Sequence, residues 1–183
     1  MSIEISLKLS ESDLTHFREL MHTAIEKASK LPPAQVVAKA QELCKEMEDA
    51  SIPDFVKVRL NSLSTLIQAL EDDEWQIPDD EKAEILTSLA YFSEPHDLVP
   101  DNIPGLGYLD DAIMIELVIQ DMSLDLEAYT SFCSFRRAEE NRRGADANVN
   151  RESWLEAGRT EYRSRLRRNK SKSSGRRLFS RVM

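Results

Sequence analysis

Apolar residues recur at intervals of three and four along most of the chain, which is the spacing of one face of an α-helix. Five stripes stand out, and in chain order they are Leu14, Phe17, Leu20, Met21, Ala24 and Ala28; Val36, Val37, Ala40, Leu43, Cys44 and Met47; Phe55, Val58, Leu63, Leu66, Ile67 and Leu70; Ile85, Leu86, Leu89, Ala90 and Phe92; and Leu126, Tyr129, Phe132, Cys133 and Phe135. No stretch alternates between apolar and polar residues as a half-buried strand would. The pattern predicts an all-α bundle of about six or seven helices.

Residues that favour helix ends separate these stripes. Ser10 or Ser12 can cap the first helix, and the run Leu31-Pro32-Pro33 stops it. The segment 109–122 is apolar around most of its circumference, so we expect it to be the central buried helix. Trp154, with the leucine after it, is expected to anchor a last helix.

Composition changes along the chain and suggests three segments. Residues 1–81 form the N-terminal helical part of the bundle, and residues 82–143 form a second helical segment. Residues 144–183 become first polar and then basic, and within them 170–177 read as disordered. The fold class predicted is therefore a helical bundle with a proline-rich crossing loop at 94–108 and a disordered basic C-terminal tail.

The stretch EPHDLVPDNIPGLGYLDD, residues 94–111, places helix breakers and carboxylates between two apolar helical stripes. Its characteristic residues are Pro95, Asp97, Pro100, Asp101, Pro104, Gly105, Gly107, Asp110 and Asp111. Proline drives the preceding residue toward extended backbone, and glycine accepts positive φ. We expect residues 94–108 to form an ordered, largely non-helical crossing that its leucines hold against the bundle.

The aspartates of this loop have a structural interpretation. Asp97 and Asp101 are expected to accept hydrogen bonds from backbone N–H groups of the loop. Asp110 and Asp111 are expected in the first turn of the next helix, where negative charge is favourable. On this interpretation the aspartates stabilise the fold and perform no chemistry.

Two chemical interpretations of the same loop stay open. Asp97, Asp101, Asp110 and Asp111 supply the oxygen ligands that Mg²⁺ or Ca²⁺ prefers, although their spacing matches no known calcium loop. His96 beside a carboxylate is a candidate for general acid–base catalysis. No nucleophile motif and no phosphate-binding loop accompanies it.

The run YFSEPHDLVPDNIPGLGYLDD, residues 91–111, resembles the signature of the YkvA-like family of bacterial proteins. That signature is an apolar helix, then P-x-D-L-I/V-P-D-x-I-P-x-L-G-x-L-D-D, then another apolar helix, and the resemblance covers about residues 82–125. It implies a helical domain of unknown function that often occurs in membrane-associated proteins, with no catalytic residue to carry over. The present sequence departs from the membrane-leaning members because Glu116 and Gln120 interrupt its second apolar helix.

Charge is distributed unevenly along the chain, whose net charge is −9. Residues 1–135 hold 9 Lys and Arg against 27 Asp and Glu, whereas residues 159–183 hold 10 Lys and Arg against Glu161 alone. The candidate polyanion-binding residues are Arg159, Arg163, Arg165, Arg167, Arg168, Lys170, Lys172, Arg176, Arg177 and Arg181. Three interpretations stay open: the tail binds nucleic acid, docks on the acidic body of its own chain, or holds an anionic membrane surface.

The cysteines and the length of the longest apolar run indicate where in the cell the protein is expected. Two isolated cysteines, Cys44 and Cys133, are typical of a reducing compartment and argue against a zinc site or a disulfide framework. The apolar run 112–119 is far shorter than the ~20 residues that cross a bilayer. We therefore expect a cytoplasmic protein, with a peripheral position on the membrane as the alternative.

The functional hypothesis is a non-enzymatic interaction protein that needs no cofactor. Its expected partners are nucleic acid or an anionic membrane surface at the tail and a protein at the loop, and the sequence identifies no small-molecule substrate. The rival hypotheses are a peripheral membrane adaptor and a divalent-metal-dependent enzyme that uses the loop aspartates.

Overall fold

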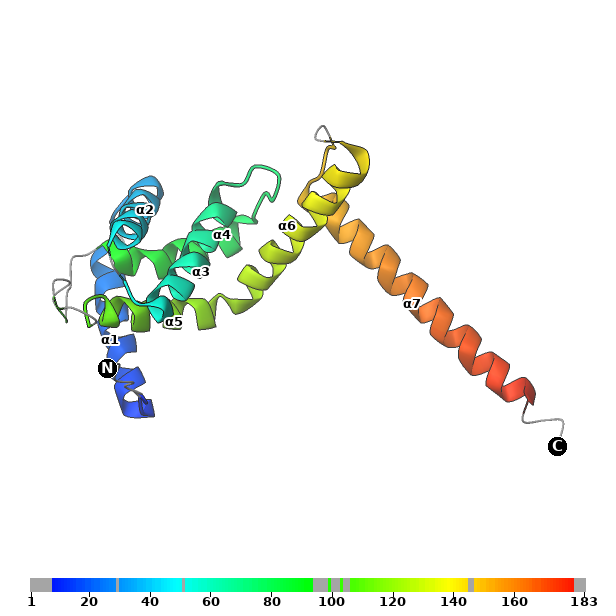
Figure 1. The fold of residues 1–183 in the computed structure, drawn as a ribbon, viewed down its shortest axis with the longest axis horizontal. Coiled ribbons are helices and arrows are strands. Elements are labelled where there is room, and N and C mark those ends of the chain that lie inside the picture. Colours follow the sequence, from blue (N-terminus) through cyan, green and yellow to red (C-terminus); the bar gives the residue numbers. More distant parts are fainter. Residues whose placement is uncertain are drawn as a thin grey trace, which may run out of the picture. The chain divides into compact units, whose positions relative to one another are not determined.

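The computed structural model describes residues 8–28, 30–50, 52–93, 99, 103, 106–144 and 147–179, with side chains as far as residue 165 (Figure 1). This part of the chain contains seven α-helices, one 3₁₀ helix and no strand, which confirms the all-α prediction. The elements are α1 (Glu11–Ala28), α2 (Pro33–Asp49), α3 (Asp54–Glu71), α4 (Asp79–Leu89), the 3₁₀ helix η1 (Ala90–Ser93), α5 (Leu109–Asp121), α6 (Ser123–Arg143) and α7 (Arg151–Phe179).

The chain divides into two compact units. Unit 1 comprises Met1–Asp72 and Ile77–Ala128, and unit 2 comprises Asp73–Gln76 and Tyr129–Met183. The segment 82–143, which the sequence suggested as one part, therefore contributes to both units. The short connection between α3 and α4 belongs to unit 2, although the two helices themselves belong to unit 1.

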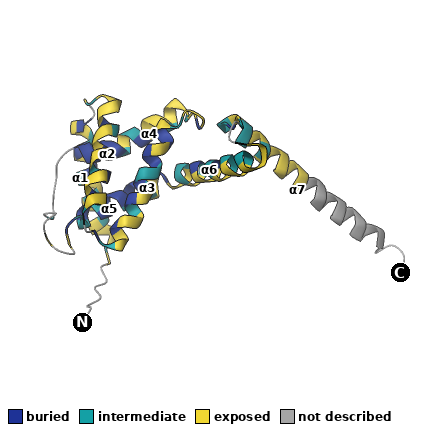
Figure 2. Cartoon of the chain, turned by 45° about the horizontal axis from the view of Figure 1, so that its top comes forward, coloured by how far each residue is buried: buried dark blue, intermediate teal, exposed yellow. Residues whose placement is uncertain are grey.

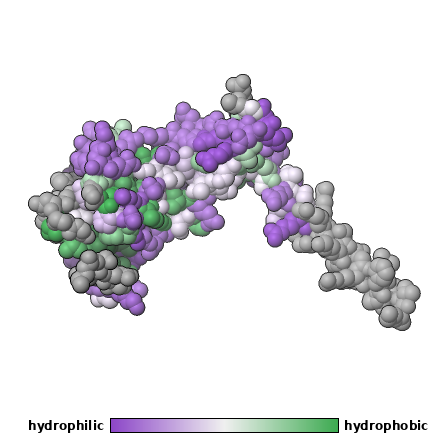
Figure 3. Space-filling model, in the orientation of Figure 1, coloured by the Kyte–Doolittle hydropathy of each residue, from purple (hydrophilic) through white to green (hydrophobic). Residues whose placement is uncertain are grey.

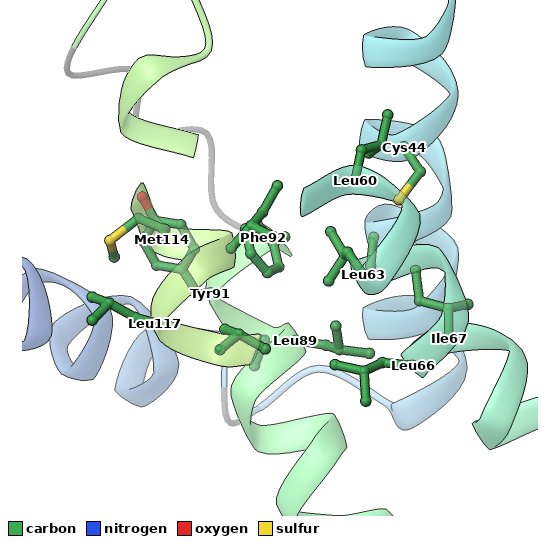
Figure 4. Close-up of a cluster of buried hydrophobic side chains, with 14 of the residues drawn as sticks. Cys44, Leu60, Leu63, Leu66, Ile67, Leu89, Tyr91, Phe92, Met114 and Leu117 are labelled. Carbon is green, nitrogen blue, oxygen red and sulfur yellow. The ribbon is translucent and has the colours of Figure 1, made fainter. Parts of the chain in front are cut away.

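A contiguous apolar core holds unit 1 together (Figure 4). Leu63 and Leu66 of α3, Leu89 of α4, and Met114 and Leu117 of α5 are each at most 2 % exposed. The 3₁₀ helix η1 adds the buried rings of Tyr91 and Phe92, which lie among these side chains in Figure 4. Burial of this much apolar surface is the main favourable contribution to folding.

Helix α5 is the most completely covered helix of unit 1 (Figure 2). Only Gln120 and Asp121 among its residues are exposed, and the rest are buried or half-buried. This confirms the prediction of a central buried helix. Glu116, which interrupts the apolar pattern, forms an ion pair with Arg59 of α3 at 2.9 Å.

The start of α1 is a capping box built by Ser10. The Ser10 hydroxyl accepts a hydrogen bond from the Asp13 backbone N–H at 3.3 Å, and the Asp13 carboxylate accepts one from the Ser10 backbone N–H at 2.8 Å. These two bonds satisfy backbone N–H groups that have no partner within a helix. Of the two predicted caps, Ser10 is therefore the one used.

The predicted apolar face of α3 is partly wrong. Phe55 and Val58 are 42 % and 66 % exposed, although both belong to the predicted stripe. The inner face instead begins at Val56 and continues through Leu60 to Leu63, again at steps of four and three. Both registers satisfy helical periodicity near the start of the helix, so the pattern alone could not choose between them.

The predicted disorder of residues 170–177 is also corrected. Helix α7 continues through this segment to Phe179. The start of the helix is capped by Asn150, whose side-chain oxygen accepts a hydrogen bond from the Ser153 backbone N–H at 2.9 Å. Arginine and glutamate have high helix propensity, and residues 151–179 contain no proline, so a polar composition does not prevent a helix here.

Unit 2 is organised around Trp75, which is 1 % exposed. Its ring lies 5.1 Å from Phe132, 5.7 Å from Tyr129 and 5.5 Å from Trp154, measured between ring centroids. The Arg151 guanidinium lies 4.4 Å from the centroid of the same ring, a cation–π contact. The connection between α3 and α4 is thus anchored among side chains of α6 and α7, and both tryptophans serve as anchors.

Candidate functional site

Asp110 connects the proline-rich crossing to helix α5. It lies in the first turn of α5 with Asp111, as predicted, and it is 3 % exposed. Its Oδ2 accepts a hydrogen bond from the Val99 backbone N–H at 3.2 Å. The sequence predicted the helix-start position but missed this bond, which ties the crossing to α5.

The two ends of the crossing are held by further contacts. On α2, the Lys39 ammonium donates a hydrogen bond to the Ser93 carbonyl at 2.7 Å, directly before the crossing. Near its other end, the Ile103 carbonyl accepts hydrogen bonds from the backbone N–H groups of Leu106 and Gly107. Tyr108 then takes a left-handed conformation, with φ of 63°, before α5 begins. Nothing in the local sequence indicated the role of Lys39.

Other predicted residues of this loop lie outside the described residues. They are Glu94, Pro95, His96, Asp97, Pro100, Asp101, Pro104 and Gly105. The hydrogen bonds predicted for Asp97 and Asp101, the metal hypothesis and the catalytic hypothesis for His96 therefore stay predictions. Within the described part of the chain, no three His, Cys, Asp or Glu side chains lie together in a group that could hold a metal ion.

Cys44 offers little reactivity in the described structure. Cys44 is buried in the core of unit 1, and this burial raises the pKa of its thiol. A thiol with a raised pKa stays protonated at neutral pH and is a poor nucleophile. Cys44 therefore acts as an apolar core residue, which agrees with its place in the stripe of α2.

Unit 2 contains an open groove of about 590 Å³ between α6 and α7. Within it, the Glu139 carboxylate contacts Arg142 and Arg143, each at 2.6 Å. The hydrogen bond from Arg142 lowers the pKa of Glu139 below its ordinary value. Glu156 and Glu161 of α7 also line the groove, without a histidine or cysteine among its lining residues. No nucleophile paired with a base is present in this lining.

Apart from Arg137, which is exposed on α6, the arginines of unit 2 whose side chains are described fall into two groups. Arg136 pairs with Glu74 at 2.7 Å, Arg151 stacks on Trp75, and Arg142 and Arg143 pair with Glu139. These four guanidinium groups contact other side chains within the unit.

The second group lies further along α7. Arg159, Arg163 and Arg165 are exposed, and none of them makes an ion pair with another residue of the described chain. The sequence of α7 is mainly hydrophilic, and hydrophilic residues are drawn in purple in Figure 3. The helical backbone continues through the positions of Arg167, Arg168, Lys170, Lys172, Arg176 and Arg177, whereas Arg181 lies outside the described residues.

Comparison with known proteins finds a match in one region of the chain. The model of DUF1232, a protein family of unknown function, matches residues 81–117. This range runs from the first turn of α4 through the proline-rich crossing into α5. The match supports a domain of unknown function where the sequence resembles the YkvA-like family, without confirming that family name. No curated protein and no solved structure matched the chain.

Helix length and hydropathy decide whether a helix can insert into a membrane. Among the helices that the structure describes, none combines the length and the apolar character required to span a bilayer.

Proposed function

We propose that this chain is a non-enzymatic interaction protein whose helix α7 contacts the phosphate backbone of nucleic acid. The observation that carries the proposal is the exposure of Arg159, Arg163 and Arg165 on one helix, without ion pairs to other described residues. Residues 159–183 add up to a net charge of +9. A cluster of this kind binds phosphates by releasing their condensed counterions, and it requires no contact with bases.

The acidic charge of unit 1 opposes this binding. Unit 1 holds 9 Lys and Arg against 25 Asp and Glu, which gives a net charge of −16. Exposed charges are screened over about 8 Å at physiological ionic strength. Repulsion therefore acts mainly on phosphates close to unit 1, and we expect binding to be confined to α7.

The test compares two variants of the full chain from which the same number of positive charges is removed. The binding variant carries Arg159→Gln, Arg163→Gln and Arg165→Gln. We measure affinity for a duplex DNA at several salt concentrations. The logarithm of the affinity of the unmodified chain should fall linearly with the logarithm of salt concentration. In the binding variant, the slope should become shallower by about one unit for each phosphate that an arginine no longer neutralises.

The matched control carries Lys27→Gln, Lys30→Gln and Lys45→Gln, which are exposed positions in unit 1. The control should keep the slope of the unmodified chain, because net charge changes equally but α7 does not change. The proposal would be contradicted by an affinity that does not depend on salt, or by a salt-dependence slope that becomes shallower by the same amount in both variants.

A further inference from the structure

Tyr162 is an aromatic residue on the exposed part of α7, and the phosphate binding proposed above gives it no role. Tyr162 is 64 % exposed, which is unusual for a large ring on a helix that is otherwise hydrophilic. Arg159 and Arg165 lie three residues before and three residues after it, and both are exposed. Residues three apart are neighbours on a helix surface, so the ring is flanked by two guanidinium groups.

The groove of unit 2 shows on which face of α7 Tyr162 lies. Six residues of α7 line the groove and mark the face turned toward α6, namely Ser153, Glu156, Ala157, Thr160, Glu161 and Ser164. At about 100° per residue, Tyr162 lies roughly 100–180° from these positions around the helix axis, and their mean direction is nearly opposite to it. The ring of Tyr162 thus lies on the face of α7 opposite the groove.

The position four residues before Tyr162 is a glycine. A Cβ atom added at Gly158 would meet no heavy atom within 4 Å, so this part of the helix surface is open. Because the Tyr162 side chain is 64 % exposed, a planar ligand can reach its ring.

We infer that Tyr162 stacks on an unpaired base while Arg159 and Arg165 contact the flanking phosphates, so that α7 binds single-stranded nucleic acid in preference to duplex. The inference rests on the proposed function and specifies its ligand. An exposed aromatic ring can stack on the face of any base, whereas bases within a duplex already stack on each other. Stacking contributes about 1–3 kcal/mol per base, and this contribution is available only with a single strand.

The experiment measures affinity for a labelled oligothymidine and for a duplex of the same length, at one salt concentration, with the full chain. Tyr162→Ala should weaken binding to the single strand by about 5- to 100-fold, which is the stacking contribution expressed as an affinity ratio. Tyr162→Phe keeps the ring and should stay within about twofold of the unmodified chain. Both variants should bind the duplex within about twofold of the unmodified chain.

A second variant tests the space beside the ring without removing the ring. Gly158→Leu places a side chain four residues before Tyr162, where it can pack against the ring and cover it. Because leucine has higher helix propensity than glycine, the helix should be retained. We expect this variant also to bind the single strand more weakly and to keep its affinity for the duplex.

The outcomes separate this inference from the proposed function. If Tyr162→Ala changes neither affinity while the triple arginine variant lowers both, phosphate binding stands and the stacking inference is overturned. If the unmodified chain binds neither nucleic acid, both are overturned. Binding to vesicles of anionic lipid in that case would assign α7 to a membrane surface.

Discussion

The two units differ in both charge and core. Unit 1 has a net charge of −16 and an apolar core shared by α1 to α5, whereas unit 2 holds 15 Lys and Arg against 8 Asp and Glu, a net charge of +7. At the centre of unit 2, the ring of Trp75 packs against three other rings and one guanidinium. The two units therefore differ in what they contain: unit 1 has the extended apolar core, and unit 2 carries the exposed arginines of α7.

The strongest test of this difference removes the aromatic centre of unit 2. Trp75→Ala should cost unit 2 about 3–5 kcal/mol, because the variant no longer has the fully buried ring around which the unit packs. Hydrogen exchange should show lower protection for α7 and for the part of α6 in unit 2, with α2 and α5 unchanged. An equal decrease of protection in both units would show that they do not fold as separate compact units.

The matching test in unit 1 uses Leu63, which is 0 % exposed. Leu63→Ala should lower the stability of unit 1 by about 2–5 kcal/mol, because less apolar surface is buried and a cavity is left behind. Val58→Ala on the same helix is the control, and it should change stability by less than about 0.5 kcal/mol because Val58 is 66 % exposed. A large effect of the control would indicate that a partner covers this face of α3.

A smaller effect is expected at Asp110. Asp110→Ala removes a buried acceptor and leaves the Val99 N–H without its partner, at a cost of about 1–3 kcal/mol. Chemical denaturation measures this cost. The same variant also addresses the enzyme hypothesis. If the chain catalyses a reaction and Asp110→Ala abolishes it at unchanged stability, the loop aspartates have a chemical role.

The smallest expected effect is a pH dependence at the start of α1. Hydrogen bonds from Ser10 lower the pKa of Asp13 below its ordinary value of 3.8. A lowered pKa in the folded state means that the capping box is fully formed above the ordinary Asp pKa and is lost as the pH falls through the lowered value. An NMR titration of the Asp13 carboxyl should show this lowered pKa, and Ser10→Ala should return it toward 3.8. An unchanged titration in Ser10→Ala would show that the capping box does not set the pKa of Asp13.

Local sequence signals predicted most of unit 1. The stripes of α1 and α2, the serine cap and the start of α5 at the paired aspartates follow from spacing and capping within a few residues. The register at the start of α3 was wrong because Phe55 and Val56 each begin an acceptable apolar stripe, and only the packing of α3 against α2 and α5 selects one. The contact of Lys39 with Ser93 spans 54 positions, and no local pattern encodes it.

Unit 2 was harder to predict because its centre is also formed by contacts between residues far apart in the sequence. Trp75 contacts rings more than fifty residues later in the chain, so its burial could not be derived from its acidic neighbours. Composition correctly marked residues 159–183 as basic but could not distinguish a charged helix from disorder. The sequence also could not show which arginines have partners in the fold, which is the distinction on which the proposed interface rests.

Nucleic-acid binding by α7 is tested most directly by a footprint of arginine side chains on the full chain, modified by phenylglyoxal with and without a saturating single-stranded oligonucleotide. We predict that nucleic acid protects Arg159, Arg163 and Arg165, while the exposed Arg18 of unit 1 reacts equally in both conditions. Protection of Arg18 to the same degree, or no protection on α7 under conditions where the oligonucleotide binds, would contradict the assignment of nucleic-acid binding to α7.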